Sequence, residues 1–178
     1  MMISEACLAS ILELPSQLPF SASLVFEQSY GEIDGDSASL AIFSVLVSAL
    51  SDLPLPQNIA ITGTIDQFGL VHAVGGVNDK IEGFFTICQR RGLTGKQGVI
   101  VPKANLAQLM LRQDIIDSVT AGKFTIYAVE HVNEAMYLLT GLAPDEMTKK
   151  GKYRKNTVYG RIYERLETWE EKDADDKE

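Results

Sequence analysis

The feature that most constrains the fold is a long apolar segment behind an Asp-Gly-Asp-Ser run. Its apolar side chains are Leu40, Ile42, Phe43, Val45, Leu46, Val47 and Leu50. They cover most of the circumference of a helix predicted over residues 37–52. Pro54 and Pro56 end this helix. Because such a helix is buried on several sides, the chain has to build a core around it.

The remaining pattern mixes helices with strands. Helices are predicted over residues 2–14, 78–91, 106–120 and 133–139, and strands over residues 21–28, 58–65, 71–74, 97–101 and 124–129. Residues 66–69 turn between two of these strands, which predicts a hairpin, and Asn78 is placed to cap the helix it opens. This order predicts an α+β fold with a mixed sheet and flanking helices. We expect one domain over residues 1–145, and a polar C-terminal helix or tail over residues 146–178.

Composition excludes several classes of function. The chain has 178 residues, 46% of them apolar and 22% charged, a balance typical of one globular domain. A net charge of −8 disfavours a nucleic-acid partner, because such proteins neutralise phosphates. Apolar runs are too short to span a membrane and no signal sequence opens the chain, so we expect a cytoplasmic protein. Neither Cys7 and Cys88 nor His72 and His131 have the spacing of metal ligands, and Cys88 is expected in the core.

The charged end of the chain is uneven. A basic cluster comprises Lys149, Lys150, Lys152, Arg154 and Lys155, and residues 170–178 are mostly acidic. The favoured interpretation is a solvated tail rather than a binding patch.

Residues 34–39, Asp-Gly-Asp-Ser-Ala-Ser, form the first group of candidate catalytic residues. Glycine allows a tight turn, and Ser37 then stands at or near a helix N-terminus, where unpaired N–H groups and the positive end of the helix dipole stabilise an anion. In an acyl-transfer enzyme, that anion is the oxyanion of the tetrahedral intermediate. The same residues are also ordinary helix caps, and the motif alone leaves both interpretations open.

The second group is Gly75-Gly76-Val77-Asn78-Asp79-Lys80. Lys80 falls in the first turn of its helix, where the dipole disfavours a cation, and it shares a face with apolar Val77 and Phe84. Both effects favour the neutral amine, which can accept a proton from a serine hydroxyl. The alternative is a lysine that extends along the apolar face to water. Between the two groups, Thr62 lies on a predicted strand, from which its hydroxyl can reach a lysine or a serine.

Together these segments resemble the proteolytic domain of Lon proteases, and most closely its B-type branch. The serine segment over residues 34–39, Ile61-Thr62-Gly63, Val74-Gly75-Gly76-Val77 up to Lys80, and Val99-Ile100-Val101-Pro102 with Asn105 match motifs of that family in order and interval. The resemblance covers about residues 24–142.

The resemblance implies a serine peptidase in which Ser37 is the nucleophile and Lys80 the base. It further implies that Thr62 positions the lysine, that Asp34 lies beside the site, and that Phe26 and Glu27 belong to a strand lining it. The implied fold is the Lon-type domain, similar to a domain of ribosomal protein S5. Family members cleave protein or peptide substrates inside homo-hexameric rings.

Two features depart from a complete Lon protease. The chain has no Gly-x-x-x-x-Gly-Lys-Ser/Thr loop, since Gly95-Lys96-Gln97 lacks the required spacing, so ATP and Mg²⁺ are expected only for an ATPase region outside this chain, and no cofactor within it. Ser37 also comes early, so we expect a fragment that lacks N-terminal strands. Two further hypotheses stay open: a latent assembly or binding module of the same fold, and an anion- or nucleotide-binding domain that uses residues 34–37.

Overall fold

The computed structural model describes residues 2–13, 20, 22–25, 35–144, 148 and 153–175. Its helices are α1 (Met2–Ile11), α2 (Ser39–Ser51), α3 (Val77–Arg91), the short 3-10 helix η1 (Lys103–Gln108), α4 (Gln113–Thr120), α5 (Val132–Thr140) and α6 (Val158–Asp175). Its strands are β1 (Ile59–Ile61), β2 (Thr64–Ile65), β3 (Val71–His72), β4 (Gly98–Pro102) and β5 (Thr125–Val129). The predicted α+β class is confirmed. Residues 22–25 form no strand, and the rest of the strand predicted over residues 21–28 lies outside the described residues.

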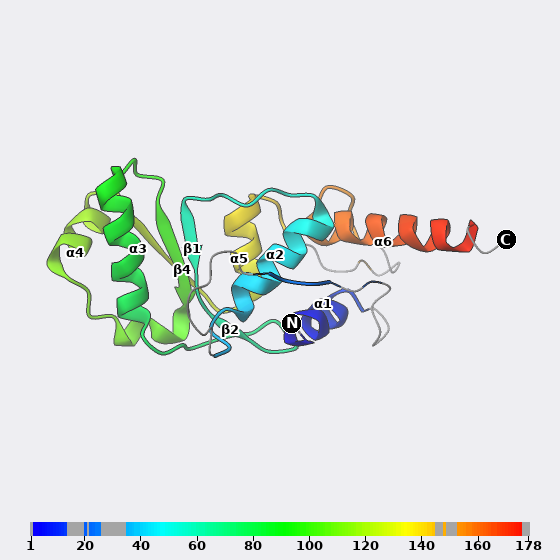
Figure 1. Cartoon of the computed structure of the whole chain (residues 1–178), viewed down its shortest axis with the longest axis horizontal. Helices are drawn as coiled ribbons and strands as arrows, with labels where there is room; N and C mark the ends of the chain where they lie inside the picture. The colour runs from blue at the N-terminus through cyan, green and yellow to red at the C-terminus, as the bar shows by residue number, and fades with distance from the viewer. Residues whose placement is uncertain are drawn as a thin grey trace.

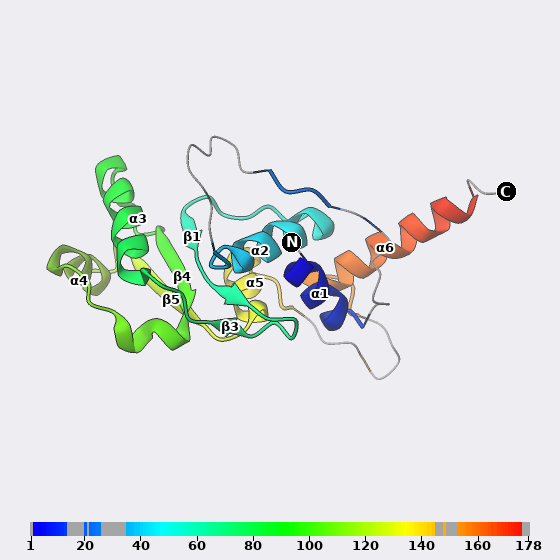
Figure 2. The ribbon, with the colours of Figure 1, turned by 60° about the horizontal axis from the view of Figure 1, so that its bottom comes forward.

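The strands form two small sheets. In the first, β1, β4 and β5 run parallel in the order β1-β4-β5. In the second, β2 and β3 pair antiparallel, as the predicted hairpin requires, and this hairpin extends toward α1 (Figures 1 and 2). A single strand over residues 58–65 is wrong: the chain changes sheets at Thr62 and Gly63. These two residues are thereby freed to contact the loop that precedes α2.

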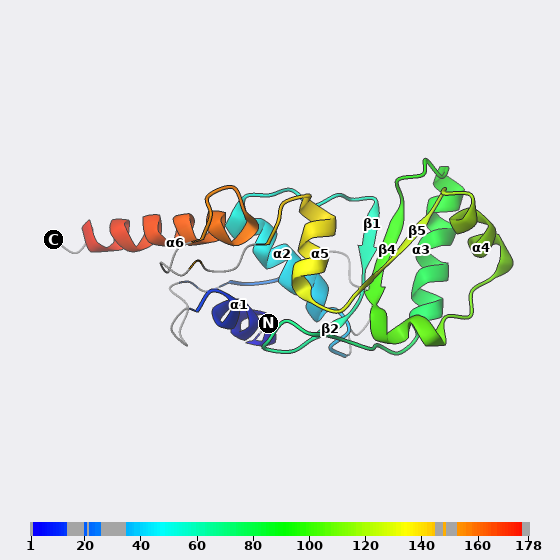
Figure 3. The ribbon, with the colours of Figure 1, turned by 180° about the vertical axis from the view of Figure 1, so that it is seen from behind.

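Helices cover both faces of the parallel sheet (Figures 1 and 3). Ile100 in β4 belongs to the core cluster of α2 and α5, whereas its neighbours Val99 and Val101 belong to the cluster of α3 and α4. This division follows from the period of two along a strand, which sends successive side chains to opposite faces. The all-apolar sequence of β4 is explained by burial on both sides.

Helix α2 is buried on several sides, as the apolar residues around its circumference predict. Leu40, Phe43 and Val47 are fully buried, and α1, α5 and α6 all pack against this helix. It ends where Asp52 adopts a left-handed conformation. The central prediction from the sequence, a helix buried on several sides, is confirmed.

Helix α6 contributes to the same core as α2. Its buried face comprises Val158, Tyr159, Ile162 and Leu166. Arg165 donates to the carbonyl oxygens of Ala49 and Leu50 at the C-terminal end of α2, where a cation also offsets the helix dipole. The division of the chain at residue 145 stays a prediction. Of the basic cluster, Lys149, Lys150 and Lys152 lie outside the described residues, as do the side chains of the acidic end.

Two local predictions are wrong for the same reason. The helix predicted over residues 106–120 is divided into η1 and α4, and Asn78 does not cap α3, which begins instead after a left-handed Gly76. The Asn78 side chain donates to the Gln108 carbonyl at 3.1 Å and accepts from the Met110 N–H at 2.9 Å. These tertiary hydrogen bonds satisfy backbone groups that a continuous helix would have paired internally.

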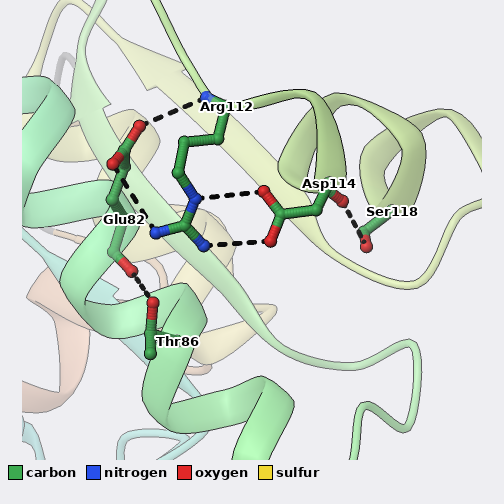
Figure 4. A network of polar contacts seen from close by, with 5 residues as sticks. All are labelled: Glu82, Thr86, Arg112, Asp114 and Ser118. Carbon is green, nitrogen blue, oxygen red and sulfur yellow. Dashed lines mark hydrogen bonds and ion pairs between the residues drawn. The ribbon is translucent and has the colours of Figure 1, made fainter.

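A polar network joins α3 to α4 on the outside of the domain (Figure 4). The Arg112 guanidinium donates two hydrogen bonds to the Asp114 carboxylate, at 3.1 and 2.9 Å, and its backbone N–H donates to Glu82 at 3.2 Å. The hydrogen bond from Arg112 is the main cause that lowers the pKa of Asp114. The network orients α4 where the 106–120 segment breaks.

Candidate active site

Ser37 lies in the turn immediately before α2. It is half-buried, and the first residue of α2 is Ser39, whose N–H donates to the Asp36 carbonyl at 2.9 Å. The residue in the N-cap position is Ala38, and no side chain caps the helix there. Ser37 therefore stands near a helix N-terminus, as predicted, while its hydroxyl is not consumed in a capping bond.

Several hydrogen bonds attach this turn and the start of α2 to residues 62–65. The Gly63 N–H donates to the Ser37 carbonyl at 2.9 Å, and the Leu40 N–H donates to the Gly63 carbonyl at 3.1 Å. The Thr64 hydroxyl donates to Asp36 at 3.1 Å, and the Ile65 N–H donates to the Ser39 hydroxyl oxygen at 2.9 Å. The serine turn is thus fixed relative to β1 and β2 by backbone and side-chain contacts.

Position 63 requires glycine because the side chains of Leu40 and Val71 pack closely against its backbone. A Cβ atom at this position would lie 2.9 Å from Leu40 Cδ2 and 3.1 Å from Val71 Cγ1. The sequence prediction omitted Gly63, Thr64 and Ser39 as residues that hold the site. The polar run Thr62-Gly63-Thr64 inside an otherwise apolar strand was the signal that could have revealed them.

Thr62 connects the serine turn to the lysine helix. It is buried, its N–H donates to the Ile100 carbonyl at 3.0 Å, and its hydroxyl donates to the Ser37 carbonyl at 3.3 Å. Lys80 Nζ donates to the same hydroxyl oxygen at 3.4 Å. A hydroxyl has one proton to donate and lone pairs to accept with, so one threonine can serve both neighbours.

Lys80 occupies the first turn of α3, as predicted, but it is exposed rather than shielded. The buried face of α3 carries Val77, Ile81, Phe85 and Cys88, so the apolar stripe passes beside Lys80. Of the two interpretations that the sequence left open for Lys80, the exposed position agrees with a side chain that reaches water rather than with one shielded on the apolar face. Among the described residues, no hydrogen bond joins Ser37 Oγ to Lys80 Nζ.

Asn105 supports the start of the lysine helix. It is fully buried, accepts from the Val74 N–H at 2.9 Å, and donates to the Val74 carbonyl at 3.0 Å. These two bonds pair its amide with the backbone like a strand partner, directly before the two glycines that lead into α3. The side chain thereby fixes the direction from which Lys80 enters the site.

Ser37, Thr62 and Lys80 line one hollow with a volume of about 240 Å³. Its other lining residues are Ala38, Ala41, Ala60, Ile61 and Val99. Three segments far apart in the sequence, those that carry Ser37, Thr62 and Lys80, thus meet at one place. Asp34, Phe26 and Glu27, the other residues proposed for this site, lie outside the described residues.

The hollow can hold a small acyl group beside a hydroxyl, an amine and the positive end of α2. In the described ranges, His, Cys, Asp and Glu side chains do not gather in groups of three that could hold a metal ion. None of the helices within those ranges is both long enough and apolar enough to cross a bilayer. Cys88 is buried, as predicted, and both cysteines are free.

Residues 31–140 match the family described as the Lon protease (S16) C-terminal proteolytic domain, and the chain belongs to that family.

Among known proteins, the chain is 75% identical to a Lon protease homolog of Haemophilus influenzae over 141 residues, which cover 79% of this chain and 24% of that protein. It is 59% identical to a Lon protease homolog of Escherichia coli K12 over 145 residues, which cover 82% of this chain and 25% of that protein. The archaeal Lon protease of Methanocaldococcus jannaschii is 46% identical over 90 residues, covering 51% of this chain and 13% of that protein. The chain thus spans about a quarter of the length of the two bacterial relatives.

Proposed function

We propose that this chain is the peptidase domain of a Lon-like protease, with Ser37 as the nucleophile and Lys80 as the general base. Ser37 Oγ attacks the carbonyl carbon of a peptide bond while the Lys80 amine, acting as the base, takes the hydroxyl proton. The resulting ammonium returns that proton to the departing amine, which leaves an acyl-enzyme ester. Water then attacks the ester carbonyl and gives a proton to Lys80. The Lys80 ammonium returns that proton to Ser37 Oγ as the bond between Oγ and the acyl carbon breaks, and the acyl part of the substrate leaves as a carboxylic acid.

One observation carries the proposal: Ser37, Thr62 and Lys80 line the same hollow. Thr62 contacts both of the others, since it donates to the Ser37 carbonyl and accepts from Lys80 Nζ. A threonine in that position fixes the amine relative to the serine turn. The positive end of α2 next to Ser37 supports the charge that develops on the attacked carbonyl oxygen.

A latent module of the same fold is the second candidate, and a specific observation favours it. Lys80 is exposed, and no hydrogen bond joins it to Ser37 in the described part of the chain. A general base has to come within about 2.6–3.2 Å of the proton it removes, although such contacts often tighten only with substrate bound. The two candidates therefore differ in whether this chain by itself forms the working pair.

Several properties of the larger protein follow from the family. We propose that its substrates are proteins or peptides, that it assembles as a hexameric ring in the cytoplasm, and that ATP and Mg²⁺ act on an ATPase region outside this chain. The chain's matches to about a quarter of its bacterial relatives leave ample length for such a region.

A fluorophosphonate probe tests the proposal, because it reacts covalently only with an activated serine. We expect mass spectrometry to find one adduct, on Ser37, and to find none in Ser37→Ala or Lys80→Ala. Ser118→Ala and Lys103→Ala are the controls: these residues bond to the Asp114 carbonyl and to Glu130, away from the hollow, so labelling should persist.

Thermal melts of all four variants separate loss of activation from loss of folding. Normal labelling of a folded Lys80→Ala variant contradicts the assigned base. Absence of labelling in this chain, together with labelling of Ser37 in a longer chain that includes the ATPase region, selects the latent module.

A further inference from the structure

Four basic side chains gather at the end of the domain where β4 and β5 begin. This basic patch comprises Arg90, Arg91, Lys96 and Lys123, and all four residues are exposed. The two arginines end α3, Lys96 lies in the loop between α3 and β4, and Lys123 lies in the loop between α4 and β5. In the part of the chain that the structure describes, none of the four forms an ion pair.

Hydrogen bonds and close packing hold the three segments of the basic patch together. The Gln97 side chain donates to the Gly92 carbonyl at 3.3 Å, and the Thr125 N–H donates to the Gln97 carbonyl at 3.0 Å. A Cβ atom on Gly95 would lie 3.4 Å from the Gly122 carbonyl oxygen, so the two loops touch. The basic patch is therefore one surface built on fixed backbone, although its residues are far apart in the sequence.

The opposite charge is concentrated in one segment of the same chain. The net charge is −8, and residues 170–178, which we call the acidic segment, contain six acidic residues and two lysines. The structure places part of this segment in the last turns of α6, which runs to Asp175. Acidic residues are unfavourable there, because they meet the negative end of the helix dipole and repel one another. A cationic partner would offset both effects.

The basic patch and the acidic segment lie at opposite ends of the molecule. Along its longest axis, α3 and α4 lie at one end, and the last turns of α6 extend past the rest of the ribbon at the other (Figures 1 and 3). The direction of α6 is fixed, since Val158, Ile162 and Leu166 are buried in the core. The last turns of α6 therefore cannot reach the basic patch of the same copy.

We propose that the acidic segment of one copy of this chain binds to the basic patch of a second copy. Each copy then offers one surface of each kind, so the contact is head-to-tail and generates a ring or an open row of copies. Helix α6 lies outside residues 31–140, and the match to the family therefore does not account for this contact. The proposal goes beyond the peptidase function and requires no catalysis.

Sedimentation velocity of the full chain tests the contact first. We expect the average mass to rise with protein concentration in about 50 mM NaCl. Because exposed charges are screened by salt, association should weaken at least about tenfold in about 500 mM NaCl. A chain that stays monomeric up to about 500 μM in the low-salt buffer would overturn the proposal, since the paired surfaces would then have no measurable affinity.

Reversal of charge in the basic patch tests which residues form the contact. Lys96→Glu/Lys123→Glu should associate at least about tenfold more weakly than the unaltered chain. Lys103→Glu/Lys155→Glu is the matched control, because it changes the net charge equally at two exposed lysines outside the basic patch. Equal association of the two double variants would mean that net charge alone matters, and it would overturn the proposal.

A mixing experiment separates a specific contact from general repulsion. Glu170→Lys/Glu171→Lys/Asp173→Lys reverses the acidic segment and should associate as weakly as Lys96→Glu/Lys123→Glu. In an equimolar mixture of these two variants every reversed surface meets one of opposite charge, so association should return to within about threefold of the unaltered chain. A mixture that associates no better than its components overturns the proposal. Fluorophosphonate labelling of Ser37, measured on the same variants, reports on the proposed catalysis separately.

Discussion

Gly63 is the position at which one methyl group should separate the serine turn from its support. In Gly63→Ala the added Cβ would meet Leu40 Cδ2 at 2.9 Å, Val71 Cγ1 at 3.1 Å and Leu40 Cβ at 3.3 Å. Leu40 is fully buried and Val71 nearly so, which leaves neither much room to move. Overpacking of this kind costs about 1–3 kcal/mol. At about 2–4 °C per kcal/mol for a chain of this length, the melting temperature should fall by several degrees.

Two other glycines provide matched controls. In α3, Gly83 has nothing within 4 Å of an added Cβ, so Gly83→Ala should raise stability by about 0.5–1 kcal/mol through helix propensity. In Gly98→Ala the Cβ would lie 2.7 Å from the Thr125 carbonyl oxygen, which destabilises the sheet without touching Leu40. One control should therefore melt at a higher temperature than the unaltered chain, and the other at a lower temperature.

The assay combines thermal melts with the rate of fluorophosphonate labelling at a temperature where all variants are folded. We expect Gly63→Ala to lose more labelling than Gly98→Ala at comparable loss of stability, because only Gly63 bonds directly to Ser37 and Leu40. A Gly63→Ala variant that melts no lower than the unaltered chain would refute the packing argument. Equal labelling of both destabilised variants would refute the link to the serine turn.

Three further predictions address the threonine, a buried thiol and the last helix. Thr62→Val keeps the shape of the side chain but loses both hydroxyl hydrogen bonds, so stability should fall by about 1 kcal/mol and labelling of Ser37 by about tenfold. Thr86→Val is the control, because the Thr86 hydroxyl bonds within α3, and an equal loss of labelling in this variant would contradict the positioning role of Thr62. Burial raises the pKa of the Cys7 thiol to about 12 from 9.0. The unfolded chain therefore releases this proton first as pH rises, and stability should decline by about 1 kcal/mol between pH 9 and 10, a component that Cys7→Ala removes; identical pH profiles in denaturant melts would argue against it. Ile162→Ala in α6 should destabilise the chain by about 2–5 kcal/mol, because Ile162 is fully buried in the cluster of α2; a loss below about 0.5 kcal/mol in urea melts would mean that α6 is not part of the core.

Local features of the chain were sufficient to predict its main elements. The apolar residues around the helix at positions 40–50 predict a buried helix, and the turn at residues 66–69 predicts a hairpin. Each depends on periodicity or on the conformational freedom of one residue, and both are properties of a short stretch of sequence. The family of the domain also follows from short motifs and the intervals between them.

Local sequence was misleading where long-range contacts decide the backbone. Residues 58–65 have one continuous strand pattern, yet β1 pairs with β4 and β2 pairs with β3. Asparagine is a common capping residue, yet the Asn78 side chain hydrogen-bonds to the backbone of Gln108 and Met110. These bonds interrupt the helix predicted over residues 106–120. Partners about thirty positions apart leave no periodic trace in either segment.

For the candidate site, the sequence determined which residue types are present and tertiary structure determined how they meet. The motifs singled out Ser37, Thr62 and Lys80, but only the folded chain shows that Thr62 contacts both of the others and that Lys80 is exposed. Register and side-chain exposure depend on which strands and helices become neighbours, and that is decided by packing of the whole domain rather than by any one segment.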